Sequence, residues 1–281
     1  MDPRAWRRFR RNRGALVGAA LVVFVLLTAF AGPFFAPANP DHQFEHGLHE
    51  DGTPREPDGE MLLGADTVGR DELSRLLHGG RASLTAALSA TLIAVLIGLF
   101  VGTVAGYFGG RVDSALMQLV DVLQSLPFLL IAITVNRVVS SPSIVVLVVL
   151  LGVLSWTTLA RLTRAKTMQV RELEYVQAAR ALGMSEWRVL MRHVVPNVTG
   201  PAIVIGTTLV ANTILVESAM SFLGLGVPPP TSTWGTMLHD AQDMMSMAPR
   251  LVFYPGLFIV ATVFGFNLLG EGLRDALDPK D

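Results

Sequence analysis

Cysteine is missing from this chain of 281 residues, and lysine is nearly so. Without cysteine there is no disulfide to brace a loop and no thiol to act as a nucleophile or a metal ligand. The two lysines, Lys166 and Lys280, do not close a glycine-rich phosphate loop of the Walker A pattern. We therefore expect that this chain does not hydrolyse ATP by itself.

Charged residues are also scarce, at 16% against 51% hydrophobic residues, whereas soluble domains carry about 25% charged residues. The apolar residues form long blocks, and a bilayer core of about 30 Å needs roughly 20 such residues per helix. This pattern predicts an all-α membrane protein with six transmembrane helices, at residues 14–35, 84–107, 115–135, 143–160, 201–222 and 253–269.

The uneven distribution of arginine predicts the orientation, because Lys and Arg are retained on the cytoplasmic side of a membrane. Six arginines precede the first apolar block, further basic residues fill the segment 161–200, and acidic residues crowd the segment 36–81. Both termini and the loop 161–200 should therefore be cytoplasmic. The first block is longer than the apolar core of a signal peptide, about 7–15 residues, so we expect a retained anchor.

The resulting organisation has a small number of segments. We expect a cytoplasmic N-terminal segment (1–13), a first transmembrane helix (14–35), an extracytoplasmic loop (36–81), a transmembrane domain (82–273) and a cytoplasmic C-terminal tail (274–281). The extracytoplasmic loop is rich in proline, glycine and acid and should be irregular, closing with a short helix near 72–77.

The cytoplasmic loop 161–200 has helical signals of its own. Good helix formers run from 172 to 182, and Gly183 then suits a left-handed C-terminal cap. Ser185 and Glu186 suit the start of a second helix, which we expect to end before Pro196. Such a pair is either a docking surface or an amphipathic hairpin lying on lipid headgroups. Docking is favoured, because the first helix offers mainly alanine instead of a broad bulky apolar face.

The motif Gln177-Ala178-Ala179, then Gly183 after three residues, then "HVVPN" at 193–197 resembles the EAA loop of permease subunits of ATP-binding-cassette (ABC) importers. Gln177 stands where the family usually has Glu, and Val195 where it usually has Leu. The resemblance implies that this loop supplies the coupling helix that meets an ATPase. The residues it assigns to that contact are Glu174, Gln177, Ala178, Ala179, Gly183, Met184 and Trp187.

Further blocks at 62–84, 106–133, 215–238 and 255–280 are similar to the C-type permease subunit of the dipeptide, oligopeptide and nickel importer family. That resemblance implies the type I ABC importer permease fold and a prokaryotic inner (cytoplasmic) membrane. The implied partners are a homologous B-type permease subunit, two ABC ATPase subunits carrying ATP and Mg, an extracytoplasmic solute-binding protein and the lipid bilayer, with no nucleic acid. The chain itself would be no enzyme and hold no cofactor, and the solute would be a peptide or a related small molecule.

Polar residues inside the apolar blocks are candidates for a gating or pathway role, because an acid in a membrane is costly unless it faces the bundle or water. Asp121, Glu217 and Asn212 are the main candidates, although each could also join helices by hydrogen bonds. An alternative function is an ion-coupled secondary transporter using Asp121 and Glu217. An intramembrane enzyme is a weaker alternative, because no Ser/His pair, HExxH motif or suitable acid pair stands out.

Three other features predict local structure. Pro127 should kink the third transmembrane helix. Gly98, Gly102 and Gly106 form a small-residue ladder that should pack closely against a helix, within the chain or in a partner permease, with the first favoured. His42, His46 and His49 invite a metal site, but Gly47 interrupts any helix that would align them, so a solvated loop is favoured.

Overall fold

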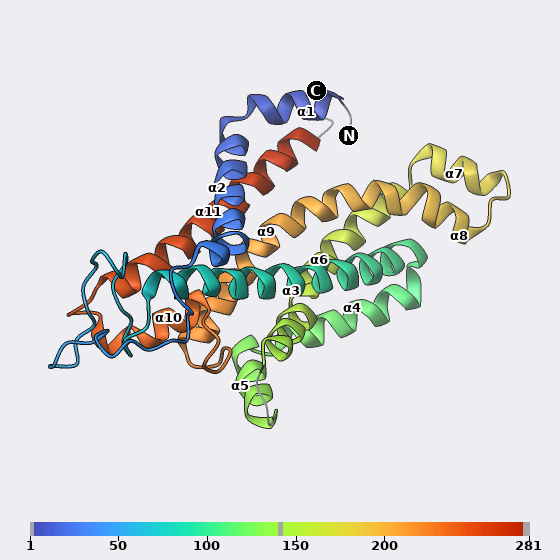
Figure 1. Cartoon of the computed structure of the whole chain (residues 1–281). Helices are drawn as coiled ribbons and strands as arrows, with labels where there is room; N and C mark the ends of the chain where they lie inside the picture. Colours follow the sequence, from blue (N-terminus) through green and yellow to red (C-terminus); the bar gives the residue numbers. More distant parts are fainter. Residues whose placement is uncertain (1–2, 140–142, 278–281) are drawn as a thin grey trace.

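The computed structural model describes residues 3–139 and 143–277, and in this part the chain is helical, with isolated β-bridges in place of strands (Figure 1). The helices are α1 Pro3–Arg11, α2 Arg13–Phe30, η1 Gly32–Phe35, α3 Glu72–Phe108, α4 Gly110–Ser125, α5 Phe128–Val138, α6 Ile144–Arg171, α7 Glu174–Ala181, α8 Glu186–Val189, η2 Leu190–Val194, α9 Val195–Phe222, α10 Trp234–Asp240, η3 Gln242–Met244 and α11 Arg250–Leu277. Three stretches lie outside the described residues: 1–2 of the N-terminal segment, 140–142 of the link after α5, and 278–281 of the tail, which includes Lys280.

Among the described residues, five helices are long and apolar enough to cross a membrane, or six if the bent pair α4 and α5 counts as one span. This confirms the predicted all-α membrane fold. The third predicted span, 115–135, is wrong as a single helix, because α4 and α5 meet at an angle of 80°. The cause is Pro127, which holds the preceding Leu126 in an extended conformation (φ −84°, ψ 128°).

Helix α3 corrects a second expectation. The short helix predicted near 72–77 is the first turns of a continuous helix of 37 residues. Asp71 caps it by accepting a 2.7 Å hydrogen bond from the Ser74 backbone N–H. Gly79 and Gly80 do not break the helix because α10 packs on them: a Cβ at Gly80 would lie 2.7 Å from the Trp234 ring.

The glycine ladder of α3 packs within the chain, as favoured from the sequence. A Cβ at Gly102 would lie 2.4 Å from the Ala160 carbonyl oxygen, and one at Gly106 would lie 2.6 Å from that of Arg164, so α3 and α6 approach backbone to backbone. Helix α11 packs on α2 and α9, and α9 also contacts α3 and α6. The core is therefore a set of long helices lying against α3 and α9.

The two ends of the bundle differ in structure (Figure 1). One end carries α10 and the irregular loop 36–71, and we call it the α10 end. The other carries α7 and α8, and the start of α2 and the end of α11 point away from the α10 end as well. Where the start of α2 meets the end of α11, the Asn12 side chain donates a 3.0 Å hydrogen bond to the Asp275 carboxylate.

Candidate functional site

The predicted elbow after α7 is confirmed in detail. Gly183 has φ +80°, in the left-handed region that favours glycine. Its N–H donates to the Arg180 carbonyl at 2.9 Å, and the Met184 N–H donates to the Ala179 carbonyl at 3.1 Å. These two bonds form a Schellman motif, which satisfies the last carbonyls of α7 and turns the chain sharply into α8.

The second helix of the elbow does not end before Pro196, contrary to the expectation. Helix α8 runs into a π-helical turn, Leu190–Val194, and then directly into α9. In that turn the Val195 N–H donates to the Leu190 carbonyl five residues earlier. The wider π-helical turn directly before Pro196 lets the helix continue past this residue, although proline has no N–H to donate to the preceding turn. The elbow is thus a rigid extension of the long α9 helix.

The elbow has a buried face and an exposed apolar face. Val176 and Ala179 of α7 pack with Val189, Leu190 and Val194 in one cluster. On the outside, residues Leu182 and Trp187 are 88% and 68% exposed. Large apolar side chains that a fold leaves exposed together are typical of a protein contact surface.

A polar anchor fastens this elbow to the end of α3. The Tyr107 hydroxyl donates to the Glu186 carboxylate, and Arg180 pairs with the same carboxylate at 3.3 Å. The Arg180 guanidinium also lies 4.8 Å from the centre of the Tyr107 ring. From α6, Arg171 donates to the Tyr107 carbonyl at 3.0 Å. We call these four residues the Tyr107 anchor.

Sequence reasoning missed this anchor. Tyr107 and Glu186 are 79 residues apart, so no spacing rule joins them, and the only signal was that Tyr107 lies in one of the family-like blocks. The other predicted coupling residues lie as follows: Glu174, Gln177 and Ala178 are exposed on α7, and Met184 is half-buried behind the elbow. The Gln177 amide donates to the Glu172 carboxylate at 3.2 Å, which keeps it on the loop surface.

The pathway candidates do not come together. Asp121 of α4 pairs with Arg161 of α6, and both side chains are largely exposed, at 63% and 49%. Asn212 of α9 is exposed as well. Glu217, in contrast, is fully buried, and the two acids have different partners.

Glu217 joins three helices at the α10 end. Its carboxylate accepts hydrogen bonds from Ser221 at 2.9 Å, Ser83 at 3.2 Å and Ser218 at 3.4 Å. Ser83 of α3 also accepts the Trp234 backbone N–H at 3.1 Å, which ties in α10. These hydrogen bonds indicate that Glu217 has a structural role in joining α3, α9 and α10, and this role requires no bound ion.

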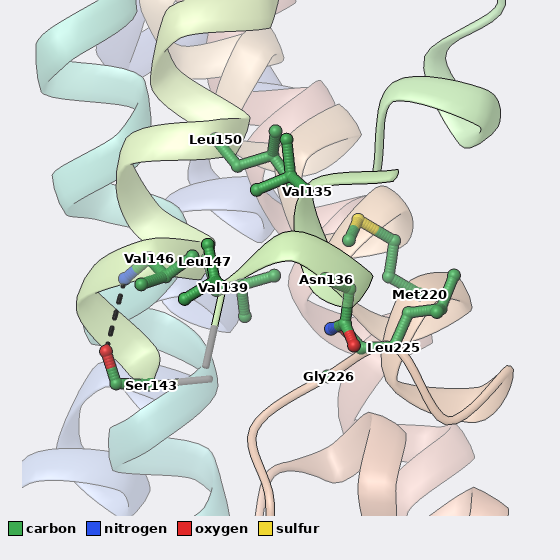
Figure 2. A pocket seen from close by; sticks show the side chains of 10 residues that line it. All are labelled: Val135, Asn136, Val139, Ser143, Val146, Leu147, Leu150, Met220, Leu225 and Gly226. Carbon is green, nitrogen blue, oxygen red and sulfur yellow. Dashed lines mark hydrogen bonds between the residues drawn. The ribbon is translucent and has the colours of Figure 1, made fainter. Parts of the chain in front are cut away.

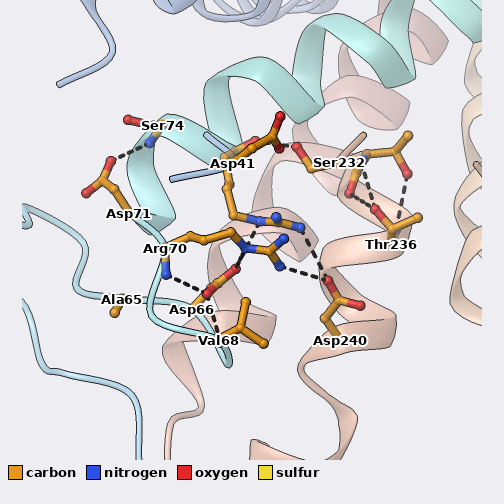
Figure 3. A network of polar contacts seen from close by, with 12 residues as sticks. Asp41, Ala65, Asp66, Val68, Arg70, Asp71, Ser74, Ser232, Thr236 and Asp240 are labelled. Atoms are coloured by element: carbon orange, nitrogen blue, oxygen red, sulfur yellow. Dashed lines mark hydrogen bonds and ion pairs between the residues drawn. The ribbon is translucent and has the colours of Figure 1, made fainter. Parts of the chain in front are cut away.

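A network of ion pairs holds the loop 36–71 against α10. Figure 3 shows Arg70 between Asp66 and Asp240. Asp66 accepts from Arg70 Nε at 2.7 Å and Arg75 Nε at 3.2 Å, and Asp240 accepts from Arg75 Nη2 at 3.3 Å. Burial raises the pKa of the Asp240 carboxyl, while both guanidinium groups oppose that shift.

Two smaller features complete the α10 end. His46 lies 3.4 Å from Glu60 in the exposed loop, and His42 packs its ring edge against Phe44. In the described residues no three metal-ligating side chains gather.

Where α5 meets α9, a cavity of about 20 Å³ is lined by Asn136 and Met220 among others (Figure 2). This volume holds about one water and is too small for a solute.

Comparison with known proteins places this geometry in a family. Residues 84–280 match the family described as binding-protein-dependent transport system inner membrane component, and residues 4–49 match the N-terminal transmembrane domain of oligopeptide transport permease C. Over 98% of this chain, it is 39% identical to a dipeptide transport system permease protein of Bacillus subtilis and 37% identical to a glutathione transport system permease protein of Pectobacterium atrosepticum, covering 85% and 90% of those proteins. A dipeptide transport system permease protein of Haemophilus influenzae is 37% identical, with 98% of this chain and 93% of that protein covered.

These matches confirm the resemblance, the type I fold and the role as a transmembrane permease subunit of an ABC importer. Such a permease works with an ATPase and with a binding protein. The comparisons give no support to the ion-coupled alternative. With a family match over residues 84–280 and a helical bundle of five or six candidate spans in the described residues, this chain belongs to the family of binding-protein-dependent transport system inner membrane components.

Proposed function

We propose that this chain is one of two different permease chains in an importer of small peptides. Its partners are a homologous B-type permease subunit, two ABC ATPase subunits that bind ATP and Mg, and an extracytoplasmic solute-binding protein. The cargo class follows from its relatives, whose names assign dipeptides and glutathione, a small peptide-like solute. Both termini and the elbow face the cytoplasm, in agreement with the arginine distribution.

The observation that carries this proposal is the exposed apolar tip of the elbow. Leu182 and Trp187 project from a segment whose inner face is fully packed and which the Tyr107 anchor holds in place. A surface that is rigid behind and apolar in front suits a groove on an ATPase. Because α8 continues into α9, a displacement of the tip is passed directly to a membrane-spanning helix.

The exposed pair Asp121 and Arg161 supports a second permease chain. Both side chains lie on the surface of this chain, and exposure of charged groups to lipid is costly. We infer that this face of α4 and α6 meets the partner permease or the aqueous path between the two chains. Asn212, exposed on α9, is a further candidate for that path.

The test is purification of the complex from its native membrane, followed by identification of the companions and an ATPase assay in proteoliposomes. We expect a second permease, two ATPases and a binding protein that stimulates ATP hydrolysis when loaded with dialanine. Uptake of dialanine by the isolated chain with no nucleotide would contradict the proposal.

A further inference from the structure

Helix α1 does not continue the line of α2 but is turned across its start (Figure 1). The turn is at Asn12, whose backbone is extended (φ −83°, ψ 108°) and whose side chain caps α2 by accepting from the Ala15 backbone N–H. Beyond this turn, α1 also contacts α11. Helix α1 therefore leaves the direction of the membrane span and lies over the end of the bundle.

The depth of α1 relative to the bilayer follows from α2. Leu16 and Val17 are the first large apolar residues exposed on α2, at 45% and 50%, and such residues on a membrane-spanning helix face the lipid chains. Asn12 precedes Leu16 by four residues, which is about 6 Å of helix at 1.5 Å per residue. Since interfacial helices bury an apolar face about 5–10 Å into the headgroup and acyl boundary, α1 is at the depth of the headgroups.

Helix α1 has an aromatic side and a cationic side. Trp6 and Phe9 are three residues apart and share one side, where their rings stack with centroids 6.0 Å apart, and Trp6 is 51% exposed. Arg7 and Arg11 are on the opposite side, and Arg10 is on the flank; we call these three exposed residues the α1 arginines. An aromatic side opposite a cationic side is typical of a helix that lies in a membrane surface.

The positive charge of α1 is not cancelled by the segments around it. Within the described part of the chain, the α1 arginines form no ion pair. On the neighbouring α11, Asp275 accepts a hydrogen bond from Asn12. Residues 1–13 and 271–281 together hold eight Lys or Arg against five Asp or Glu. This excess of positive charge is complementary to a membrane surface that carries anionic lipids.

We propose that α1 is an interfacial helix that binds anionic phospholipid headgroups through the α1 arginines and rests Trp6 and Phe9 on the acyl chains. The partner is a lipid because α1 is at headgroup depth, so a protein would have to enter the bilayer surface to cover Trp6. The inference goes beyond the proposed function and uses it only to assign this surface to the cytoplasmic leaflet.

The test measures how tightly the purified complex binds added lipid. Native mass spectrometry follows the complex in detergent during titration with phosphatidylglycerol, and in parallel with phosphatidylcholine of the same acyl chains. In the glutamine triple, Arg7→Gln, Arg10→Gln and Arg11→Gln remove the charge together. All other lipid sites are unchanged, so the difference from wild type reports on α1. We expect the affinity for phosphatidylglycerol to fall at least about tenfold and that for phosphatidylcholine to stay the same.

The lysine triple, with Lys at the same three positions, is the matched control. It keeps the charge and should retain the affinity for phosphatidylglycerol within about twofold, because attraction to the membrane surface depends on charge and not on the shape of the cation. If the glutamine triple does not insert or assemble, Arg10→Gln alone is measured. This single change leaves the other arginines of the N-terminal segment in place, and the expected loss is about fivefold.

Each other outcome overturns the inference. Equal affinity of wild type and the glutamine triple for phosphatidylglycerol shows that α1 binds no anionic lipid, and an equal loss for both lipids shows that headgroup charge is not recognised. If the glutamine triple keeps its lipid but loses a protein subunit, the α1 arginines contact an acidic protein surface instead. The titration uses neither ATP nor solute, so its result is independent of whether the complex imports a peptide.

Discussion

At the scale of single residues, Gly183 is the position where sequence and structure agree most closely. Its φ of +80° is required by the Schellman motif, and a Cβ added there would meet no atom within 4 Å. The constraint is therefore on the backbone alone. A side chain fits in space, but for most residues the left-handed conformation costs about 1–2 kcal/mol.

This separation makes a sharp test. Gly183→Val should change the angle between α7 and α8, because a β-branched residue is strained at this φ. We expect uptake per ATP hydrolysed to fall at least about tenfold, while the amount of complex in the membrane stays the same. Gly183→Asn is the control, because asparagine tolerates the left-handed region, and it should retain most of the coupling. Normal coupling in the valine variant would show that the elbow angle does not matter.

For Glu217 we predict that loss of the charge has little effect on uptake. Its contacts are hydroxyl donors, so Glu217→Gln removes the charge, keeps one acceptor oxygen and replaces the other by an NH2 donor. We expect uptake to stay within about twofold of wild type, because the helix fastening survives in part. Glu217→Leu removes every acceptor and should lower the melting temperature of the purified complex. Abolished uptake in the glutamine variant, with an unchanged melting temperature, would instead support an ion-carrying role.

At the scale of elements, the contact between α3 and α6 depends on glycine. A Cβ at Gly102 would lie 2.4 Å from the Ala160 carbonyl oxygen, which belongs to the backbone and cannot rotate away. The two helices would have to separate. The short distance between α3 and α6 therefore depends on a glycine in one helix facing the backbone of the other.

Gly102→Ala should thus destabilise the chain by about 1–3 kcal/mol, the usual cost of overpacking. The measurement is the melting temperature of the purified permease in detergent, which should fall by several degrees. Gly256→Ala is the matched control in α11, since a Cβ there meets no atom within 4 Å. It should raise stability slightly or leave it unchanged, because alanine is the better helix former. Equal effects of the two substitutions would contradict this account of α3 and α6.

The elements that the sequence predicted well are those set by local chemistry. Apolar blocks predicted the long helices, and Gly183 with Ser185 predicted the elbow. The elements it predicted poorly depend on distant partners: α3 continues through Gly79 and Gly80 because Trp234 packs there, some 150 residues later. Pro196 does not end the helix, because the π-helical turn Leu190–Val194 precedes it and the chain stays helical. The Tyr107 anchor and the ion-pair network around Arg75 had no local signal at all, since each forms only when separate segments meet.

At the scale of the whole molecule, the orientation of the bundle is the broadest prediction. Because the sequence has no cysteine, a single introduced cysteine supplies the only thiol in this chain. Leu182→Cys at the elbow tip and Asp51→Cys in the exposed loop are suitable, because both side chains are exposed.

In intact cells a membrane-impermeant maleimide should label Asp51→Cys and leave Leu182→Cys unlabelled. After the membrane is permeabilised, Leu182→Cys should react as well, unless the ATPase covers it. Removing the ATPase then exposes the thiol and shows which of the two explanations holds. Labelling of Leu182→Cys in intact cells would invert the molecule and contradict the coupling role.

Helix α3 runs uninterrupted from the α10 end of the bundle to the elbow. Tyr107, in its last turn, is fastened to the elbow, and Arg75, in its first, belongs to the ion-pair network at the α10 end. These residues are 32 positions apart on a straight count, or about 48 Å of helix at 1.5 Å per residue. A tilt of about 5° over that length displaces the far end by about 4 Å, more than the length of a hydrogen bond. In the proposed importer, a small tilt of α3 that starts at the elbow would therefore move the α10 end by more than the length of a hydrogen bond.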